Sequence, residues 1–415
     1  GHVGSALVQL LTEQGDAITE RAGLRIELAK VAVRDLAKAR SVDVAPGVLT
    51  GDALAVVRDP GIEVVVEVIG GVDPAGKLIL DALSAGKPVV TANKELVATH
   101  GAELFDAARD AGVDLLFEAA VGGGIPVIRP LRESLAGERI SRVMGIVNGT
   151  TNYILTRMGE AGTAYSEALA EAQRLGYAES DPSADVEGYD AAAKAAILAS
   201  VAFGARVVAA DVHREGITAV TASDIAFAAR RGYVIKLLAV AEQAGGAVAV
   251  RVHPALVPVT HPLAAVRDAF NAVFIEGEAV GELMLYGRGA GGRPTASAVL
   301  GDLIDAAHNL RSGGAGRTAA LAPVAIRPVD DLMSQYYLSF EVEDRAGVAH
   351  AVFGVTAEHR VSIESMTQEG LGDEARLVLI THTTRERDMQ AVVEGLRQLD
   401  AVHRIGSLLR VVGAE

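Results

Sequence analysis

Apolar runs and amphipathic stretches alternate along the first 125 residues of the chain. The positions Val3, Leu7, Leu10 and Leu11 fall on one face of a helix. Buried strands rich in apolar residues are predicted between the helices, at 26–33, 64–69, 88–90 and 113–117. Strands and helices that alternate in this way predict an α/β domain with a doubly wound parallel sheet.

The alternation breaks up between about residues 126 and 290. Helical periodicity is found near 165–175, 190–203 and 223–242, and strand-like runs near 140–147, 249–252 and 272–276. We therefore predict a mixed α+β domain over 126–293. The helical period returns from Pro294 to Leu310, and we expect the segment 294–311 to complete the first domain, 1–125.

The C-terminal part of the chain has its own order of elements. Glycines and prolines between Ser312 and Pro328 predict a linker over 312–335. The pattern then predicts a strand, a helix, two strands, a helix and a strand, at 337–342, 348–358, 362–368, 376–382, 389–399 and 403–412. This βαββαβ order predicts a ferredoxin-like domain over 336–415.

Composition and charge exclude several classes of protein. The chain has 415 residues, which is enough for more than one hydrophobic core. Its formal net charge of −15 disfavours binding to nucleic acid or to an anionic membrane surface. Because it has no cysteine, disulfides, cysteine nucleophiles and cysteine metal sites are excluded. No apolar run approaches the roughly 20 residues that cross a bilayer. Since no signal peptide is visible, we expect a cytoplasmic protein.

The first four residues, Gly1-His2-Val3-Gly4, begin the first predicted helix. If two further residues preceded Gly1, the segment would complete the Gly-x-Gly-x-x-Gly fingerprint of the Rossmann dinucleotide-binding fold, so we expect the chain to lack the first strand and the first glycine. Gly1 would let the backbone approach a pyrophosphate, and Gly4 would let the helix pack on a strand. Taken alone, the four residues also fit the glycine-rich start of any helix.

Further polar or glycine-rich residues follow the predicted strands, at the edge where open α/β sheets bind ligands. Arg34-Asp35 comes first, and because arginine suits the 2′-phosphate of NADP whereas aspartate suits the free hydroxyls of NAD, both cofactors fit; we favour NADP through Arg34. The others are Gly70-Gly71, Thr91-Ala92-Asn93-Lys94, and Glu118 before Gly122-Gly123-Gly124. By itself, Lys94 would also fit a solvated charge at the start of a helix.

The segment from Ala172 to Lys194 places five carboxylates in a loop that runs into an alanine-rich helix. Asp190 and Lys194 are four residues apart on this helix, so they lie on one face, where the carboxylate can orient the ammonium. Such a pair on an exposed helix is common and contributes only about 0.3–0.5 kcal/mol. The spacing alone therefore does not establish a catalytic pair.

The order of residues in this segment resembles the signature of the homoserine dehydrogenases. The matching residues are Ala172, Gly176, Tyr177, Asp181, Pro182, Asp185, Val186, Gly188, Asp190 and Lys194. Further segments that resemble the family are 91–94, 118–126, 148–152 and 287–291. The resemblance extends from residue 1 to about 320, and the departure from the family pattern is the absent first strand and first glycine.

The resemblance implies reversible, NAD(P)-dependent reduction of L-aspartate 4-semialdehyde to L-homoserine, in threonine and methionine biosynthesis. Reduction of an aldehyde needs a proton for the developing alkoxide, and a lysine desolvated between carboxylates and cofactor can donate it without a metal. By the resemblance, Lys194 is the proton donor, Asp190 orients it, and Lys94 lies near the nicotinamide and the substrate hydroxyl. The sequence leaves open which lysine moves the proton, and we favour Lys194.

The resemblance also implies substrate and cofactor contacts. Glu179 and Asp185 would bind the substrate ammonium, which needs a carboxylate partner. The other predicted substrate contacts are Asn148, Gly149, Thr150 and Tyr177, and the predicted cofactor contacts are Gly1, His2, Val3, Gly4, Arg34, Gly70, Thr91, Lys94 and Gly291. Residues 148–152 fit a helix cap equally well. The acidic residues alone would also fit a solvated loop.

Glu118 and the backbone carbonyls of Val121, Gly123 and Ile125 resemble the sodium site of the family. Hard cations prefer oxygen ligands, and this segment offers one carboxylate beside a glycine-rich backbone. A tight turn that needs glycine for its backbone angles fits the same residues.

Residues 336–412 resemble an ACT domain, through 344–348 at the first strand-to-helix turn and 363–368 along the second strand. ACT domains pair across subunits and bind amino acids, so the resemblance implies feedback inhibition by L-threonine in a homodimer or homotetramer. The regulatory contacts would be Asp344, Gly347, Val348 and Gln368. A dimerisation module that binds no ligand is the alternative, because a fold does not imply a function.

Two other functions fit part of these features. Aspartate-semialdehyde dehydrogenase acts on the same metabolite, but its thioester chemistry needs a cysteine, which the chain lacks. A sensor without turnover could keep the nucleotide-binding fold and the ACT domain. Such a sensor would have little use for Lys94, Glu179, Asp190 and Lys194 together.

Overall fold

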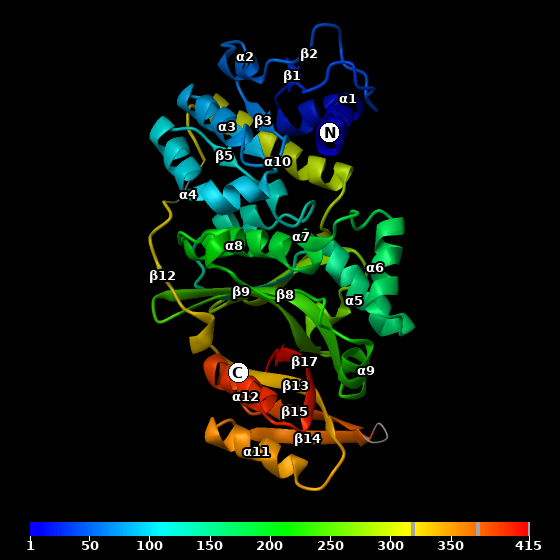
Figure 1. Ribbon diagram of the computed structural model, residues 1–415. Coiled ribbons are helices and arrows are strands. Elements are labelled where there is room, and N and C mark those ends of the chain that lie inside the picture. Colours follow the sequence, from blue (N-terminus) through cyan, green and yellow to red (C-terminus); the bar gives the residue numbers. More distant parts are fainter. Residues whose placement is uncertain (317–319, 371–373, 414–415) are drawn as a thin grey trace. The chain divides into compact units, whose positions relative to one another are not determined.

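The computed structural model describes residues 1–316, 320–370 and 374–413 (Figure 1). The chain divides into two compact units. Unit 1 comprises Gly1–Val143, Ala193–Asp211 and Asn271–Val324, and unit 2 comprises Met144–Ala192, Val212–Phe270 and Ala325–Glu415. Within the described ranges, no helix combines the length and the apolar character needed to span a membrane.

The N-terminal part of unit 1 alternates helices with short parallel strands, which confirms the predicted α/β pattern. The helices are α1 (His2–Ala22), α2 (Ala53–Arg58), α3 (Ala75–Ser84) and α4 (Lys94–Ala111). The strands form two parallel sheets, β1 (Val31–Ala32) with β2 (Leu49–Thr50), and β3 (Val65–Glu67), β4 (Val89–Thr91) and β5 (Leu115–Leu116) in that order. The strand predicted over 26–33 is confined to β1, because only these two residues pair with β2.

Helix α10 (Gly292–Arg311) packs on α1, although the two helices are far apart in the sequence. Apolar side chains from both helices form a common core with residues of β4 and of the segment after β5, and the buried members are Ala6, Leu7, Leu10, Ile18, Val90, Ala119, Ala296, Val299, Leu300, Leu303 and Ala306. Gly4 lets α1 approach the end of β3, since a Cβ there would already touch the Val68 side chain at 3.4 Å. The helix predicted over 294–310 is confirmed.

Unit 1 also contains short helices and strands after β5. The short helices are η1 (Glu118–Ala120), η2 (Pro130–Ser134) and η3 (Ala209–Asp211). Strands β11 (Gly281–Arg288), β10 (Phe270–Gly277) and β6 (Ile140–Ile146) are neighbours in that order. The strands predicted near 140–147 and 272–276 are confirmed, whereas β11 was not predicted.

Unit 2 is built on two long antiparallel strands, β8 (Tyr233–Ala244) and β9 (Ala247–Pro258). The other edge of β9 pairs in turn with three parallel segments, β12 (Ala325–Ile326), β7 (His213–Arg214) and β17 (Val402–Val411). The helices of this part are α5 (Gly149–Ala161), α6 (Tyr165–Arg174), α7 (Ser183–Val186), α9 (Ala222–Arg230) and η4 (Pro262–Ala265). Helix α8 (Tyr189–Phe203) begins in unit 2 and continues into unit 1.

The prediction of a single helix over 223–242 is wrong beyond residue 230. Helix α9 ends at Arg230, Gly232 has a φ of 77°, and β8 begins at Tyr233. Every residue from Ile235 to Ala241 is buried, so side chains on both faces of this strand are apolar or paired. A strand buried on both faces lacks the alternation of apolar and polar positions, and its apolar run resembles that of a buried helix.

The C-terminal part of unit 2 has the predicted βαββαβ order. Its elements are β13 (Met333–Glu343), α11 (Val348–Glu358), β14 (Ile363–Gly370), β15 (Glu374–Thr381), α12 (Glu386–Arg397) and β17, with the short η5 (Val329–Asp331) and β16 (Thr384–Arg385) beside them. The strands lie in the order β17-β13-β15-β14, which is the ferredoxin-like arrangement. Tyr336, Leu338 and Phe340 of β13 form its core with α11 and α12.

Strand β17 joins this domain to the long strands of unit 2, because Arg410 and Val411 pair in parallel with Ala255 and Leu256 of β9. Parts of two predicted segments lie outside the described residues. These parts are 317–319 of the predicted linker, and 371–373 and 414–415 of the predicted ferredoxin-like domain.

Candidate active site

A buried carboxylate fixes the ends of the parallel strands β3 and β4 in unit 1. Glu67, at the end of β3, accepts a hydrogen bond from the Thr91 hydroxyl (2.6 Å) and from the backbone N–H groups of Ile69 (2.6 Å) and Gly70 (3.0 Å). Thr91 was predicted as a cofactor contact, which stays a prediction; its hydroxyl donates to Glu67. The two strand ends are therefore joined by a side-chain pair that sequence reasoning did not find.

The turn after β3 leaves open space where a dinucleotide would lie. Gly70 and Gly71 have φ values of 81° and 74°, and a Cβ on either residue, or on Gly1, would meet no atom within 4 Å. The residues at these strand ends fit a nucleotide, because glycine lets a phosphate approach the backbone closely. Arg34 and Asp35 are exposed just after β1, at the position predicted to meet the ribose.

Asn93 connects this turn to helix α4. Its Nδ2 donates to the carbonyl of Gly71 (2.7 Å), and its Oδ1 accepts from the backbone N–H of Leu96 (3.1 Å), which caps the helix. Lys94, the first residue of α4, is thereby placed at the carboxyl end of β4. The sequence predicted a polar residue at this edge, and the capping role of Asn93 was not predicted.

Two glycine-rich turns cross in unit 1. A Cβ on Gly123 would lie 2.4 Å from the carbonyl oxygen of Gly289, and a Cβ on Gly124 would lie 2.9 Å from the Pro294 side chain. Gly291 has a φ of 121° at the start of α10, and a Cβ on the next residue, Gly292, would lie 3.2 Å from the carbonyl oxygen of His2. The segments predicted to contact the cofactor through Gly1 to Gly4 and through Gly291 are thus neighbours.

Glu118 lies beside this crossing and is satisfied by backbone donors. Its carboxylate accepts from the N–H groups of Val127 (2.6 Å), Ile128 (2.8 Å) and Arg129 (2.8 Å), and its own N–H donates to Asp302 (2.8 Å). In the part of the chain that the structure describes, no group of three or more His, Cys, Asp or Glu side chains could hold a metal ion. The predicted sodium site, with Glu118, Val121, Gly123 and Ile125, stays a prediction.

Asn148 joins a predicted substrate-binding carboxylate, Asp185, to the predicted catalytic carboxylate Asp190 in unit 2. Its Nδ2 donates to Asp185 (2.7 Å) and to Asp190 (2.9 Å), and its Oδ1 accepts from the N–H of Thr151 (2.9 Å), capping α5. Asn148 is 5% and Asp190 8% exposed, so the bond between these two residues forms almost out of water, whereas Asp185 is half-buried. The sequence left a cap and a substrate contact as alternatives for this segment; the cap is observed.

The other predicted substrate residues surround the same loop. The Thr150 hydroxyl donates to the carbonyl of Tyr177 (2.6 Å), and the Tyr177 ring packs on Tyr153 with 4.9 Å between ring centres while remaining 45% exposed. Glu179 is exposed, and Gln173 donates to its backbone carbonyl (3.0 Å). Gly149 permits a close approach, since a Cβ there would lie 2.8 Å from the carbonyl oxygen of Ala269.

Asp190 and Lys194 both belong to α8, four residues apart as the sequence predicts. Gly188, with a φ of 82°, immediately precedes this helix at a place where a Cβ would lie 3.2 Å from the Arg214 side chain. Lys194 is 8% exposed, an unusual environment for an ammonium group. Such burial is compatible with a proton-donating lysine, and the catalytic role of Lys194 stays a prediction.

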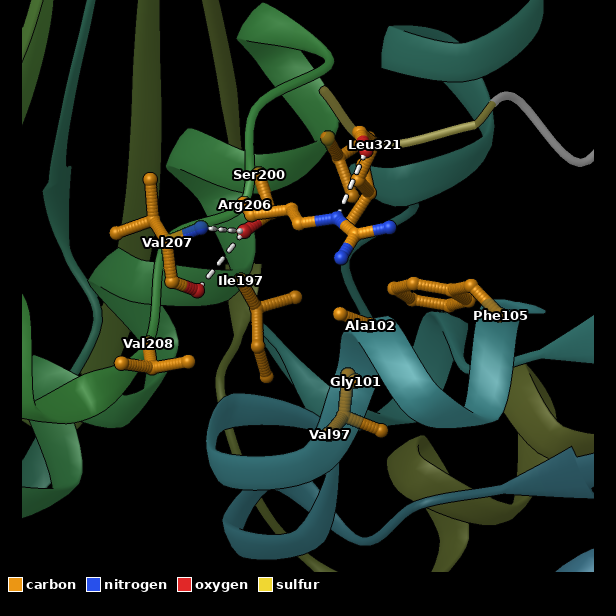
Figure 2. Close-up of a pocket in the computed structure, with 11 residues that line it drawn as sticks. Val97, Gly101, Ala102, Phe105, Ile197, Ser200, Arg206, Val207, Val208 and Leu321 are labelled. Carbon is orange, nitrogen blue, oxygen red and sulfur yellow. Dashed lines mark hydrogen bonds between the residues drawn. The ribbon is translucent and has the colours of Figure 1, made fainter. Parts of the chain in front are cut away.

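Helices α4 and α8 line one small pocket in unit 1 (Figure 2). Val97 of α4 and Ile197 of α8 are both in its wall, and Arg206 closes it by donating to the carbonyl of Leu321 (3.0 Å). Lys94 and Lys194 each stand three residues before one of these two wall residues. The two predicted lysines therefore lie on helices that are neighbours.

A buried lysine near the predicted site was missed by sequence reasoning, whereas its partner Asn152 lies in the segment 148–152 that was named for a helix cap or a substrate contact. Lys236 of β8 donates to Asn152 of α5 (2.9 Å), and Asn152 in turn donates to the carbonyl of Asp268 (2.8 Å). Burial lowers the pKa of Lys236 to about 8, with a further lowering from Arg267. The one signal in the sequence was a lysine inside the apolar run Ile235 to Ala241.

The predicted regulatory residues meet at one turn of the C-terminal domain. Gln368 of β14 donates to the Asp344 carboxylate (3.0 Å). Gly347, with a φ of 93°, caps α11, and Val348 is the first residue of that helix. These four residues are thus brought together by the strand-to-helix turn after β13.

Comparison with known proteins assigns each part of the chain. Residues 1–118 match the family model for the homoserine dehydrogenase NAD-binding domain, residues 126–304 that for homoserine dehydrogenase, and residues 336–401 that for the ACT domain. The homoserine dehydrogenase of Corynebacterium glutamicum is 50% identical over 99% of this chain and 94% of its own length. That of Mycobacterium tuberculosis is 49% identical over 100% of this chain and 96% of its own length.

Solved structures agree with these matches. The crystal structure of a homoserine dehydrogenase from Thiobacillus denitrificans has a TM-score of 0.94 and 41% identity, covering 100% of this chain and 97% of that one. A hyperthermophilic archaeal homoserine dehydrogenase in complex with NADPH has a TM-score of 0.62 and 30% identity, covering 74% of this chain and 95% of that one. The chain therefore belongs to the homoserine dehydrogenase family of nicotinamide-dependent oxidoreductases.

Proposed function

We propose that Lys194 donates the proton when this enzyme reduces L-aspartate 4-semialdehyde to L-homoserine. When bound, the reduced nicotinamide supplies the hydride that adds to the aldehyde carbon. The ammonium of Lys194 gives a proton to the aldehyde oxygen, and the neutral amine is then reprotonated from solvent. Asp190, one helical turn before Lys194, favours the charged form of the lysine before transfer. Lys94 is proposed to contact the substrate hydroxyl and the nicotinamide.

The observation that supports these roles best is the amide of Asn148, which donates to Asp185 and Asp190 at once. A carboxylate can accept several hydrogen bonds at once, so an amide donor does not prevent either carboxylate from also facing a cation. We propose that Asp185, with Glu179, binds the substrate ammonium, and that Asp190 orients Lys194. Gly149, Thr150 and Tyr177 then shape the substrate side of the same loop.

The test is the change in nicotinamide absorbance with L-homoserine and NADP or NAD, using the full-length enzyme. Lys194→Ala should lower kcat by about 10²- to 10⁴-fold, the usual contribution of a general acid or base. Lys94→Ala should cost less, and Lys77→Ala, which removes an exposed lysine of α3, should have no effect. Retention by Lys194→Ala of a third or more of the wild-type kcat would refute its role.

We propose NADP as the preferred cofactor, bound through Arg34, His2, Val3 and the glycines at 1, 4, 70 and 291. The exposed guanidinium of Arg34 follows β1, where a 2′-phosphate would be recognised. Arg34→Ala should reduce the ratio of kcat/KM for NADP to that for NAD. An unchanged ratio would remove Arg34 from cofactor selection.

We propose that L-threonine inhibits the enzyme by binding at Asp344, Gly347, Val348 and Gln368, and that the active form is a homodimer or homotetramer. A carboxylate and an amide that already contact each other across the β13–α11 turn offer partners for an amino acid's ammonium and carboxylate. Titration of the intact enzyme with L-threonine should give inhibition that Gln368→Ala weakens. Absence of both binding and inhibition would refute the proposed inhibition by L-threonine. Analytical ultracentrifugation would measure the number of subunits in the active form.

We propose that sodium binds at Glu118 and the carbonyls of Val121, Gly123 and Ile125. Glu118 is buried, the backbone carbonyls of residues 121–125 follow it closely in the chain, and hard cations favour a carboxylate together with such oxygens. Activity measured at constant ionic strength should rise when sodium replaces tetramethylammonium. Equal activity in the two salts would count against the site.

A further inference from the structure

Lys236 lies outside every residue set that the dehydrogenase signature defines, yet it is one of the most buried charged groups of unit 2. It belongs to the long strand β8, and only 4% of its surface is exposed. A buried ammonium is costly unless its donors are paired. Its Nζ donates to Oδ1 of Asn152 at 2.9 Å and to the carbonyl oxygen of Val266.

Asn152 connects this lysine to the loop that precedes β10. Its Nδ2 donates to the carbonyls of Val266 (3.3 Å), Asp268 (2.8 Å) and Phe270 (3.2 Å). Asp268 has a φ of 53°, which is uncommon for a residue with a side chain and persists only where the surroundings impose it. Lys236 and Asn152 together therefore fix the backbone of residues 266–270.

The loop in turn limits where helix α5 can begin. Gly149, the first residue of α5, lies so close to the loop that a Cβ would be 2.8 Å from the carbonyl oxygen of Ala269. Asn152 lies one turn further along the same helix, so α5 meets the loop at two successive contacts. Helix α5 also packs on β8 itself.

The residue immediately before Gly149 is Asn148, whose amide donates to both Asp185 and Asp190. A small shift of the first turn of α5 would move this amide away from one carboxylate or both. Catalytic groups misplaced by about 1 Å can lose about 100-fold in rate.

We propose that Lys236 is a positioning residue of the dehydrogenase reaction. Through Asn152 and the first turn of α5, it holds the amide of Asn148 where this amide donates to both Asp185 and Asp190. The proposal rests on the roles proposed above for these two carboxylates. In this role Lys236 acts only through the residues that it positions and contacts neither substrate nor cofactor. Its ammonium and the three carbonyls that Asn152 binds form a clamp, defined here as Lys236, Asn152 and residues 266–270.

The first test is Lys236→Met in the intact enzyme, which keeps an unbranched apolar stem and removes the three donors. We expect kcat/KM for L-homoserine to fall by about 10- to 100-fold, mainly through KM because Asp185 binds the substrate, while KM for the nicotinamide nucleotide stays within about twofold. Lys87→Met is the matched control, because Lys87 is also buried (7% exposed) and also donates to a carbonyl, that of Asp59, in unit 1. It should lower stability and leave the KM for L-homoserine unchanged.

Asn152→Asp provides a second variant in case Lys236→Met does not fold. The carboxylate still accepts from Lys236 but no longer donates to the loop carbonyls, so the same rise in KM for L-homoserine is expected. Asn152→Gln, which retains both an acceptor and a donor on a longer side chain, should recover part of the loss. The two substitutions Lys236→Met and Asn152→Asp should be non-additive, because they break the same clamp.

The proposal is overturned if folded Lys236→Met has a KM for L-homoserine within about twofold of wild type, or if Lys87→Met raises this KM equally. Asp185→Asn and Asp190→Asn separate this outcome from failure of the proposed site. If both of those variants keep full activity, the assignment of the carboxylates fails. If they lose activity and Lys236→Met does not, only the clamp fails.

Discussion

Gly123 and Gly289, where glycine-rich turns cross in unit 1, and Asp224, in the first turn of helix α9 in unit 2, are all buried, but different chemical groups fix the two regions. In unit 1 the backbone of Gly123 approaches Gly289 so closely that no side chain fits. In unit 2 the side chain of Asp224 is the centre of a hydrogen-bond network. It accepts hydrogen bonds from Tyr337 (2.7 Å), Ser339 (3.1 Å), Arg376 (2.6 Å), Ser407 (2.7 Å) and its own cap residue Thr221 (2.6 Å).

The difference between the two regions is also visible in their buried carboxyl groups. Burial raises the pKa of Asp302 in unit 1 to about 7, and the charge of Glu118 adds to this effect. Burial also acts on Asp224, but hydrogen bonds from Thr221, Ser407 and Tyr337 outweigh it and lower the pKa of that carboxyl. Asp302 has few donors, the N–H of Glu118 (2.8 Å) and the guanidinium of Arg129 (3.3 Å), whereas the larger set of donors around Asp224 favours its charged form.

The largest effect is expected from Asp224→Ala. Removal of one partner from a buried ion pair leaves the guanidinium of Arg376 without its partner, at a cost of about 3–5 kcal/mol. Tyr337, Ser339 and Ser407 lose their acceptor as well. Urea unfolding followed by circular dichroism should show the ferredoxin-like domain unfolding at a much lower urea concentration than in wild type.

The matched control for Asp224→Ala is Glu369→Ala, which breaks the ion pair of Glu369 with Arg230 on the same helix α9. That pair is exposed on both sides, with 57% of the Arg230 and 45% of the Glu369 side chain accessible, so its loss should cost about 1 kcal/mol or less. Equal effects of the two substitutions would show that burial of the Asp224 network contributes nothing to stability.

The next largest effect is expected from Gly123→Ala in unit 1. Gly123 has a φ of 57°, and the added Cβ would lie 2.4 Å from the carbonyl oxygen of Gly289, so the backbone must shift. The strain and the collision should together cost about 2–3 kcal/mol of unfolding free energy. Gly137→Ala, at an exposed turn where a Cβ meets no atom within 4 Å, should change stability by less than about 0.5 kcal/mol. A stable Gly123→Ala enzyme would mean that the crossing is loosely packed.

The comparison explains which parts of the fold the sequence could predict. The βαββαβ order of the C-terminal domain and the helix α10 follow from local periodicity, and both were predicted correctly. Strand β8 was mistaken for a helix because Ile235 to Ala241 are buried on both faces. The docking of α9 through Asp224 was not predictable, because its partners Tyr337 and Ser407 are 113 and 183 residues away.

The same reasoning applies to the site. The segment from Ala172 to Lys194 could be identified as a candidate site from the sequence, because its residues are close together in the chain and match a family signature. The amide of Asn148 was named as a candidate, but its bonds to Asp185 and Asp190 span 37 and 42 residues and leave no local pattern. Lys236 was missed for the same reason, since its partner Asn152 is 84 residues away.

The smallest effect is expected from titration of Asp302, which is the one observable that separates the two kinds of buried carboxyl directly. Because its pKa is raised to about 7 in the folded protein from 3.8, the folded protein binds a proton that the unfolded chain releases, and this proton stabilises the folded state as the pH falls through 7. Wild type should therefore gain about 1 kcal/mol of unfolding free energy relative to Asp302→Asn, whose side chain does not titrate, between pH 7.5 and pH 6.

The groups that face Asp302 are Glu118, Arg129 and Asp305, and all three are present in both proteins. The difference in stability between wild type and Asp224→Asn should not change over this range, because the pKa of Asp224 is lowered and its carboxyl stays charged. Parallel unfolding curves of wild type and Asp302→Asn at both pH values would mean that Arg129, at 3.3 Å, keeps Asp302 ionised, and the distinction between the two regions would then be one of packing alone.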